Sequence, residues 1–423
     1  MRIIKVTNVD KFAAKIIPKQ PQKNKTIVES ILKNVQKNGD NAIRKYEKKF
    51  SGANISSLRL TQTEIKNAYN KVSKIELSAL RLAKARLQKT ESTIKSILKN
   101  KTIHAEGIEI FKKFVPIESV GCYVPGGLAK YPSSVIMSVI PAKVAGVKRI
   151  VVVSPPNSDG TIDPLTIVAA DICGANEIYK TGGVQSIAAL SYGTKSIFKV
   201  DKIVGPGGAF VTTAKSLVSD QTGIDMLAGP TELGIIADTS ADPKFIALDL
   251  ISQAEHSSDT FCYLITTSKK LAKSVNKTIT ELLPKIQRGN IVKSSLKNNG
   301  FIAICKNKTD MITLANNLAP EHLQIMTKNP ESLSSRITTS GLILLGNYTP
   351  SSASDYILGS NHILPTNGFG KIRGSLSVLD FIKINTQITT SKSSLSKISK
   401  YLDVLTNAEG LPNHYESVRG RLK

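Results

Sequence analysis

The feature that most constrains the fold of this chain is an uninterrupted apolar run of β-branched residues, Ile150 to Val153. A strand that is apolar on both faces must be buried on both, which is typical of a parallel sheet covered by helices. The flanking sequence agrees, because a helical stretch follows and the alternation of strand and helix then continues to residue 218. We therefore predict an open, mostly parallel sheet in this part of the chain.

A second series of the same kind begins at Leu233. It continues with expected elements that alternate in the same way: a helix at 243–256, a strand at 261–267, a lysine-rich helix, and strands at 301–305 and 341–346. Two such series predict an α/β protein with two consecutive open, mostly parallel, Rossmann-like sheets. The cleft between the sheets is where a ligand is expected.

The two ends of the chain differ from this centre. The first hundred residues have a helical pattern, including a capping box from Thr61 to Glu64, and the last fifty are short, helical and basic. We expect four parts: a helical N-terminal region at 1–115 that packs with the second α/β domain, a first α/β domain at 116–228, a second at 229–372, and a short helical C-terminal arm at 373–423.

The formal net charge of +25 raises the possibility of nucleic-acid binding. Residues 1–100 carry 23 Lys and Arg against 7 Asp and Glu, so most of the excess lies there. The lysines follow helical spacing with little aromatic surface between them, and no recognition motif is visible. A solvated helix face is therefore the favoured interpretation, and nucleic acid is an unlikely partner.

Hydropathy and cysteine spacing indicate a cytoplasmic protein. The N-terminus lacks an apolar signal-peptide core, and the most apolar stretch, 135–147, is interrupted by Pro141 and Lys143 and is too short to cross a membrane. The four cysteines are far apart and form no CxxC pair, so we expect reduced thiols rather than disulfides or a zinc knuckle.

Four of the five histidines stand in short polar clusters within the last 170 residues. The clusters are Gln253–His256, Pro320–His322, Asp355–His362 and Glu409–His414. Imidazole titrates near neutrality and is the commonest metal ligand, so this grouping predicts a metal or proton-transfer site. Gln253 and His256 share a helix face, which suits two metal ligands, whereas the absence of HExxH argues against a zincin hydrolase.

Three glycine-rich turns follow expected strands: Tyr123–Gly127, Thr181–Gly183 and Gly205–Gly208. Glycine at such a turn lets backbone N–H groups approach a phosphate at a helix N-terminus. None of the turns matches GxGxxG with its acidic partner. Each turn is therefore either a phosphate contact or a simple chain reversal, and together they favour a nucleotide.

Taken together, these segments resemble the histidinol dehydrogenase family. The matching strings run in order from about residue 119 to the C-terminus: GCYVPGGLAKYPSSVIM, KTGGVQSIAALSYGT, VDKIVGPGGAFV, AGPTE, LISQAEH, LAPEHLQI, SDYILGSNHILPT, LSVLDFIK and AEGLPNH. The resemblance implies a zinc enzyme, with one Zn²⁺ per subunit, that oxidises L-histidinol twice with NAD, through the aldehyde, to L-histidine. The first α/β domain would be the NAD side and the second the zinc and substrate side.

The resemblance also implies a role for individual residues. It makes Glu321 and His322 the catalytic acid/base pair. It makes the zinc ligands Gln253, His256, Asp355 and His414. It gives as substrate contacts Thr231, His362 and Glu409, together with the ligand residues and His322. Tyr123, Gln185 and the position of Gly208 would contact NAD. Family members are intertwined homodimers, so Glu409 and His414 would act in the neighbouring subunit's site.

Three departures from the family pattern bear on the cofactor and substrate. Gly208 stands where the family usually has Asn, Thr231 where it has Ser, and Leu227 where Pro is common. Loss of the Asn side chain removes a contact to NAD. The alternative function is a related zinc and NAD dehydrogenase that acts on another amino alcohol or diol with the same scaffold.

Overall fold

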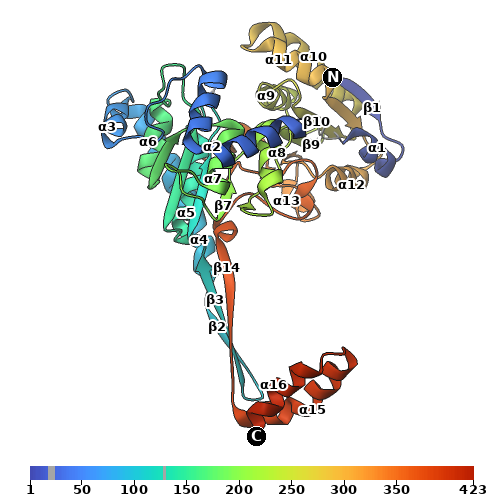
Figure 1. The fold of residues 1–423 in the computed structure, drawn as a ribbon. Helices are drawn as coiled ribbons and strands as arrows, with labels where there is room; N and C mark the ends of the chain where they lie inside the picture. The colour runs from blue at the N-terminus through green and yellow to red at the C-terminus, as the bar shows by residue number, and fades with distance from the viewer. Residues whose placement is uncertain (18–23, 127–129) are drawn as a thin grey trace.

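The computed structural model describes residues 1–17, 24–126 and 130–423. Within these residues two open sheets form the body, and every strand pair in both of them is parallel. A third, antiparallel sheet projects from the body as a long ribbon (Figure 1). The predicted α/β fold with two consecutive parallel sheets is confirmed.

The first sheet has the strand order β6-β5-β4-β7-β8. Its strands are β4 (Ser119–Tyr123), β5 (Arg149–Ser154), β6 (Glu177–Lys180), β7 (Lys202–Val204) and β8 (Gly223–Ile224). Helices α5 (Pro132–Ala145) and α6 (Pro164–Cys173) pack in one core, and α7 (Gly183–Tyr192) and α8 (Ala209–Val218) pack in another. Side chains of β5 point alternately into the two cores, which explains why this strand is apolar throughout.

The second sheet has the order β1-β11-β10-β9-β12-β13. Its strands are β1 (Arg2–Lys5), β9 (Glu232–Ala237), β10 (Phe261–Thr266), β11 (Phe301–Ile304), β12 (His322–Met326) and β13 (Leu342–Leu345). The helices of this part are α1 (Val9–Ile16), α9 (Pro243–Ala254), α10 (Lys269–Leu282), α11 (Gly289–Asn298), α12 (Lys308–Leu318), α13 (Pro330–Ser334) and α14 (Ser351–Ser354).

The structure corrects the expectation that residues 1–115 pack with the second α/β domain. Only β1 and α1 do so, because β1 pairs with β11 and α1 contacts α12. The other helices of this region cover the first sheet: α2 (Lys25–Ser51) against α7 and α8, α3 (Gln62–Tyr69) against α6, and α4 (Lys74–Ile97) against α5. The apolar stripes of α2 and α4, including Val28, Val35 and Leu87, are fully buried there.

The N-terminal region also ends in strands rather than helix. Strands β2 (Lys101–Ala105) and β3 (Ile108–Pro116) form a hairpin, and β14 (Ile382–Thr390) pairs with β3 along its whole length, from Ile382 opposite Pro116 to Thr390 opposite Ile108. The short helix η3 (Val378–Phe381) anchors the base of this ribbon on α4 and α5.

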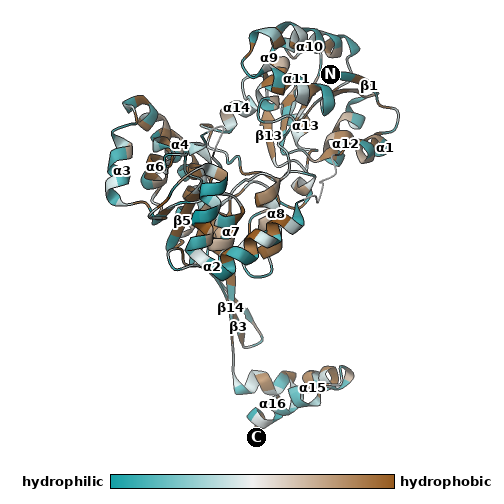
Figure 2. Ribbon diagram, turned by 45° about the horizontal axis from the view of Figure 1, so that its top comes forward, coloured by the Kyte–Doolittle hydropathy of each residue, from teal (hydrophilic) through white to brown (hydrophobic). Residues whose placement is uncertain are grey.

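Helices α15 (Lys392–Ala408) and α16 (Pro412–Leu422) sit at the far end of the ribbon, away from the body (Figures 1 and 2). A helical C-terminal arm was predicted, but strand β14 within it was not. None of the described helices is both long enough and apolar enough to cross a membrane.

Candidate active site

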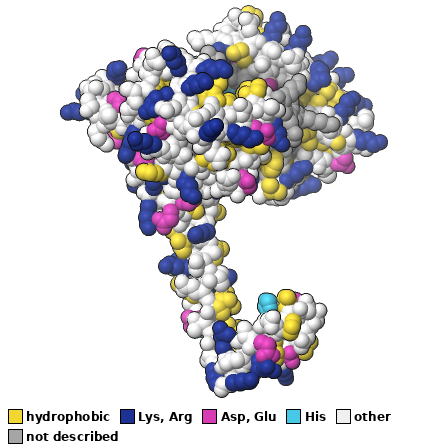
Figure 3. Space-filling model, in the orientation of Figure 1, with side chains coloured by type: hydrophobic (Ala, Val, Ile, Leu, Met, Phe, Trp, Pro, Cys, Tyr) yellow, Lys and Arg dark blue, Asp and Glu magenta, His cyan; other side chains and the backbone are white. Residues whose placement is uncertain are grey.

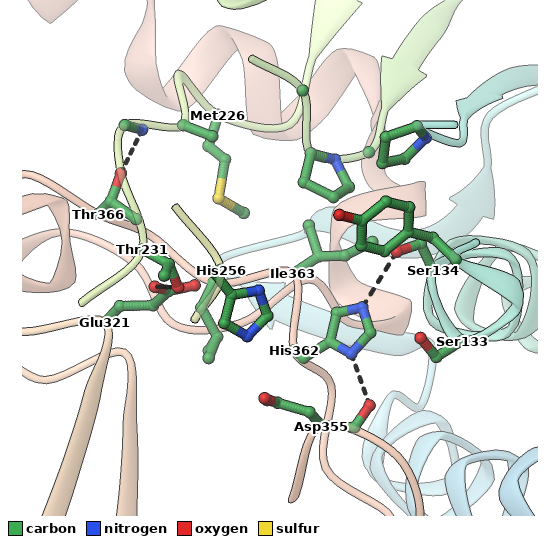
Figure 4. A pocket seen from close by; sticks show the side chains of 18 of the residues that line it. Ser133, Ser134, Met226, Thr231, His256, Glu321, Asp355, His362, Ile363 and Thr366 are labelled. Atoms are coloured by element: carbon green, nitrogen blue, oxygen red, sulfur yellow. Dashed lines mark hydrogen bonds between the residues drawn. The ribbon is translucent and has the colours of Figure 1, made fainter. Parts of the chain in front are cut away.

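A cavity of about 280 Å³ lies between the two sheets and is lined by residues of both (Figure 4). It brings together eight of the twelve expected site residues: Gly208, Thr231, Gln253, His256, Glu321, His322, Asp355 and His362. The first sheet faces the cavity with the turn Gly205–Gly208, which follows the carboxyl end of β7. The second sheet faces it with the amino ends of β9 and β12. The two sheets therefore present opposite edges to one site.

Helix α9 delivers the two ligand candidates of the Gln253–His256 cluster. Asp242 caps the helix by accepting a hydrogen bond from the Lys244 backbone, and Pro243 occupies its first position. The helix ends after Ala254, so Gln253 lies in its last turn, buried, and His256 just beyond it, at the exposed edge of the cavity. Although His256 lies at this edge, desolvation by the surrounding protein lowers its pKa, which favours a neutral imidazole that can donate a lone pair.

The Thr231 hydroxyl joins Gln253 to Glu321. Gln253 Nε2 donates to Thr231 Oγ1 at 3.0 Å, and Thr231 Oγ1 donates to Glu321 Oε2 at 2.6 Å. A hydroxyl has one proton to donate, so these two bonds fix the direction of the whole chain. Gln253 Oε1 and Glu321 Oε1 then accept no hydrogen bond from any residue that the structure describes. Both oxygens remain available to a ligand in the cavity.

His322 is almost completely buried beside two carboxylates. Its Nε2 lies 3.0 Å from Asp355 Oδ1, and its Nδ1 lies 3.8 Å from Glu321 Oε2. Burial alone would lower the pKa of His322, but the Glu321 and Asp355 charges outweigh it and raise the pKa to about 9. Burial also raises the pKa of Glu321, against the opposing charge of His322. These couplings are typical of a proton-transfer site.

His362 is held as a neutral acceptor by its two neighbours (Figure 4). Its Nδ1 donates to the Asp355 backbone oxygen at 2.6 Å, so Nε2 is left unprotonated and lies 3.3 Å from the Ser134 hydroxyl. Burial lowers the pKa of His362, which agrees with that assignment. Ser134 belongs to α5, and the cavity is therefore closed by a helix of the first domain.

Three side chains of a single subunit supply atoms of the kind that bind zinc. Gln253 offers an amide oxygen, His256 a neutral nitrogen, and the bond to His322 holds the pKa of Asp355 low against the effect of burial, so its carboxylate is ionised. In the described residues no group of three or more His, Cys, Asp and Glu side chains is close enough to hold a metal. Zinc usually takes four ligands, so this set needs a further donor.

Two of the remaining four expected site residues, Glu409 and His414, do not reach the cavity of their own chain. Glu409 follows α15 and His414 lies in α16, at the end of the projecting arm (Figure 1). Both side chains are exposed there.

On the cofactor side, the glycine-rich turn after β7 is constrained by two of its glycines. A Cβ at Gly205 would lie 2.1 Å from the Tyr123 backbone oxygen, and one at Gly207 would lie 2.5 Å from Val211. A Cβ at Gly208 would meet nothing within 4 Å, so the backbone does not require glycine there. Tyr123 and Gln185 are buried and do not line the cavity. Gly127, in the first of the three turns, lies outside the described residues.

Known proteins that resemble this chain in sequence and in fold belong to one family. The family model described as histidinol dehydrogenase matches residues 17–422. A histidinol dehydrogenase of Methanocaldococcus jannaschii is 44% identical over 398 residues, which is 94% of this chain and 92% of that protein. One from Clostridium acetobutylicum is 41% identical and covers 100% of this chain and 99% of its own length. The crystal structure of histidinol dehydrogenase from Elizabethkingia anophelis superposes with a TM-score of 0.95 at 33% identity, covering 100% of this chain and 98% of that one.

The chain belongs to the histidinol dehydrogenase family.

Membership of the histidinol dehydrogenase family confirms the resemblance seen in the sequence. Two residues that contact the site, Ser134 and Glu232, are absent from the sequence-based set. Ser134 follows Pro132 at the start of a helix, within a string that matches the family, and only its position at a helix N-terminus hinted at a role. Glu232 is a carboxyl group at the start of an otherwise apolar strand, where burial raises its pKa to about 8. A buried acidic residue in an apolar strand is the signal that could have revealed it.

Proposed function

We propose that this protein catalyses two successive NAD-dependent oxidations of L-histidinol, through L-histidinaldehyde, to L-histidine. The observation that carries the proposal is the buried Glu321–His322 pair, which faces a cavity shared by a glycine-rich turn and a cluster of metal-ligand side chains. Family membership supports the substrate and NAD, since the relatives are named for this activity.

The first oxidation removes a hydride from the carbinol carbon and a proton from its hydroxyl. His322, once neutral, is the residue placed to take that proton, with Asp355 holding the imidazole through Nε2. Bound NAD supplies the hydride acceptor. In the second oxidation water adds to the aldehyde carbon, and the unclaimed Oε1 of Glu321 can accept a proton from that water. The overall balance is one histidinol, one water and two NAD⁺ giving histidine, two NADH and three protons.

We further propose that one zinc ion per subunit is held by Gln253, His256 and Asp355 together with His414 from the neighbouring subunit. When bound, zinc would supply a positive centre that orients the nitrogens of the substrate. Support comes from the donor set, which has an unclaimed amide oxygen, a neutral imidazole and an ionised carboxylate on one side of the cavity. Glu409 and His362 would contact the polar ends of the substrate.

The shared site implies a homodimer in which the arm of each subunit covers the cavity of the other. Tyr401, Val404 and Leu405 of α15 are 60–68% exposed, so the arm carries an apolar face that its own chain does not cover (Figures 2 and 3). At the cavity, Tyr356 is also exposed, at 59%. The uncovered apolar face of the arm would be buried if it covered the cavity of a second subunit.

Counting reducing equivalents tests the proposal. Purified protein should form two NADH per L-histidinol, lose activity with a zinc chelator, and regain it when zinc is returned. Another amino alcohol or a diol serves as the comparison substrate. A single NADH per histidinol, or faster oxidation of the comparison substrate, would contradict the assignment.

A further inference from the structure

Glu47 of α2 is a completely buried carboxylate that contacts one of the three glycine-rich turns. Its Oε1 accepts hydrogen bonds from Thr181 Oγ1 at 2.8 Å, the Gly182 backbone N–H at 2.9 Å and Gln185 Nε2 at 2.8 Å. Its Oε2 accepts from Ser51 Oγ at 3.0 Å. Within the described part of the chain no cation pairs with it. Four donors and the N-terminus of α7 stabilise its charge instead.

The carboxylate occupies the place where a phosphate would bind at the start of α7. The Gly182 N–H already donates to Glu47 Oε1. An anion from the protein itself therefore satisfies the turn, and a second anion there would meet like charge. Of the two interpretations that the sequence left open for Thr181–Gly183, this arrangement favours chain reversal over phosphate contact.

The same carboxylate determines which end of the Gln185 amide is free. Glu47 can only accept hydrogen bonds, so it holds the NH₂ group of Gln185 and turns the carbonyl oxygen away. Gln185 Oε1 is buried and has no hydrogen-bond partner among the described residues, and it lies beside Gly183, where a Cβ would meet it at 3.1 Å. A buried carbonyl without a donor is costly, which points to a partner that arrives with a ligand.

We propose that Glu47 is a positioning residue for the cofactor. It fixes Gln185 so that the amide oxygen, and not the NH₂ group, is presented to a hydrogen-bond donor of NAD, that is, a hydroxyl or amino group. The inference rests on the proposed NAD-dependent function and on the expected contact of Gln185 with NAD. It adds that Glu47, in the N-terminal helical region, governs that contact without touching NAD.

A double-mutant cycle measured by calorimetric NAD binding to the full-length protein tests this role. Glu47→Met removes the acceptor and should weaken NAD binding about tenfold, which is the loss expected for one hydrogen bond to a buried group. Glu47→Gln keeps an oxygen acceptor but loses its charge, so its loss should be smaller, about threefold. Since Glu47 acts through Gln185, Glu47→Met combined with Gln185→Leu should bind NAD no more weakly than Gln185→Leu alone.

Asp40→Asn is the matched control, because Asp40 lies on the same helix and its carboxylate anchors Ser196 through the same kinds of bond. It should lower thermal stability without changing NAD affinity. Additive losses in the cycle, or equal losses for Asp40→Asn and Glu47→Met, would show that Glu47 merely packs α2 and would overturn the proposal. If Glu47→Met does not fold, the cycle with Glu47→Gln decides in the same way. Failure of the wild-type protein to bind NAD would instead refute the proposed function.

Discussion

Replacement of Thr231 by Val removes the hydroxyl that links the zinc-ligand candidate Gln253 to the acid/base candidate Glu321, while keeping nearly the same shape. The buried Gln253 Nε2 loses its only acceptor among the described residues, which should lower the free energy of unfolding by about 1–3 kcal/mol. Glu321 keeps its bond from the Glu232 backbone N–H but loses the one from Thr231, so its pKa should rise further. The amide of Gln253 is then free to turn its NH₂ group toward the cavity.

Residues that orient metal ligands typically contribute about 10–100-fold in metal affinity, so Thr231→Val should weaken zinc binding by a factor in that range. Competition against a chromophoric chelator measures the affinity without reference to turnover. Thr231→Ser is the matched control, because it keeps the hydroxyl and should bind zinc like the wild type. If Val and Ser variants hold zinc equally well, the hydroxyl does not orient Gln253 and the reasoning is wrong.

His322→Asn should slow both oxidations by about two to four orders of magnitude in single-turnover assays, whereas Glu321→Gln should slow the aldehyde step more than the alcohol step. Dimers that pair a His414→Asn subunit with a His322→Asn subunit should regain activity, because one of the two sites would then be intact, and verified mixed dimers without activity would exclude a shared site. Gly208→Asn should tighten NAD binding about fivefold, because the turn has room for the side chain and the added amide can form one hydrogen bond. Calorimetry measures this change in affinity. Burial raises the pKa of Glu91 to about 7, so its contribution to folding stability is complete below the ordinary value of 4.5 and is lost as the pH rises through 7. Denaturant unfolding should therefore show that Glu91→Gln is increasingly more stable than the wild type between pH 5 and pH 8, by up to about 3 kcal/mol, and a constant difference would contradict the assignment.

The sequence predicted the central fold because strands such as β5 and β9 are apolar on both faces, and that pattern is local. It could not predict the ribbon, since β14 pairs with β3 across more than 260 residues of chain and is exposed along almost its whole length, Ile384 and Ile388 included. It also placed α2 and α4 on the wrong sheet. An amphipathic stripe shows that one face of a helix is buried, but it does not say which surface buries it.

The candidate site was predictable only where its residues share a short segment. Glu321 and His322 adjoin in the chain, and Gln253 and His256 are only three residues apart, so their grouping was visible. Ser134 and Glu47 act on residues far away in sequence, through bonds to His362 and Gln185. A lone serine or glutamate on a helix carries no sign of such a partner, and only the fold supplies it.

The parallel pairing of β9 with β12 explains why the acid/base candidates are held so closely. His322 pairs with Leu233, so the residues just before them, Glu321 and Glu232, meet at the amino edge of the sheet. Each backbone N–H donates to the other's carboxylate, at 3.1 Å and 2.8 Å. Two ionised carboxylates this close would repel, but burial raises the pKa of Glu232 to about 8, so it can remain protonated and leave the negative charge on Glu321. A neutral Glu232 thus holds the start of β12 by accepting a hydrogen bond from the Glu321 backbone N–H. Because Glu232 carries no charge in this state, it orients Glu321 without competing with the Glu321 carboxylate for the positive charge of His322.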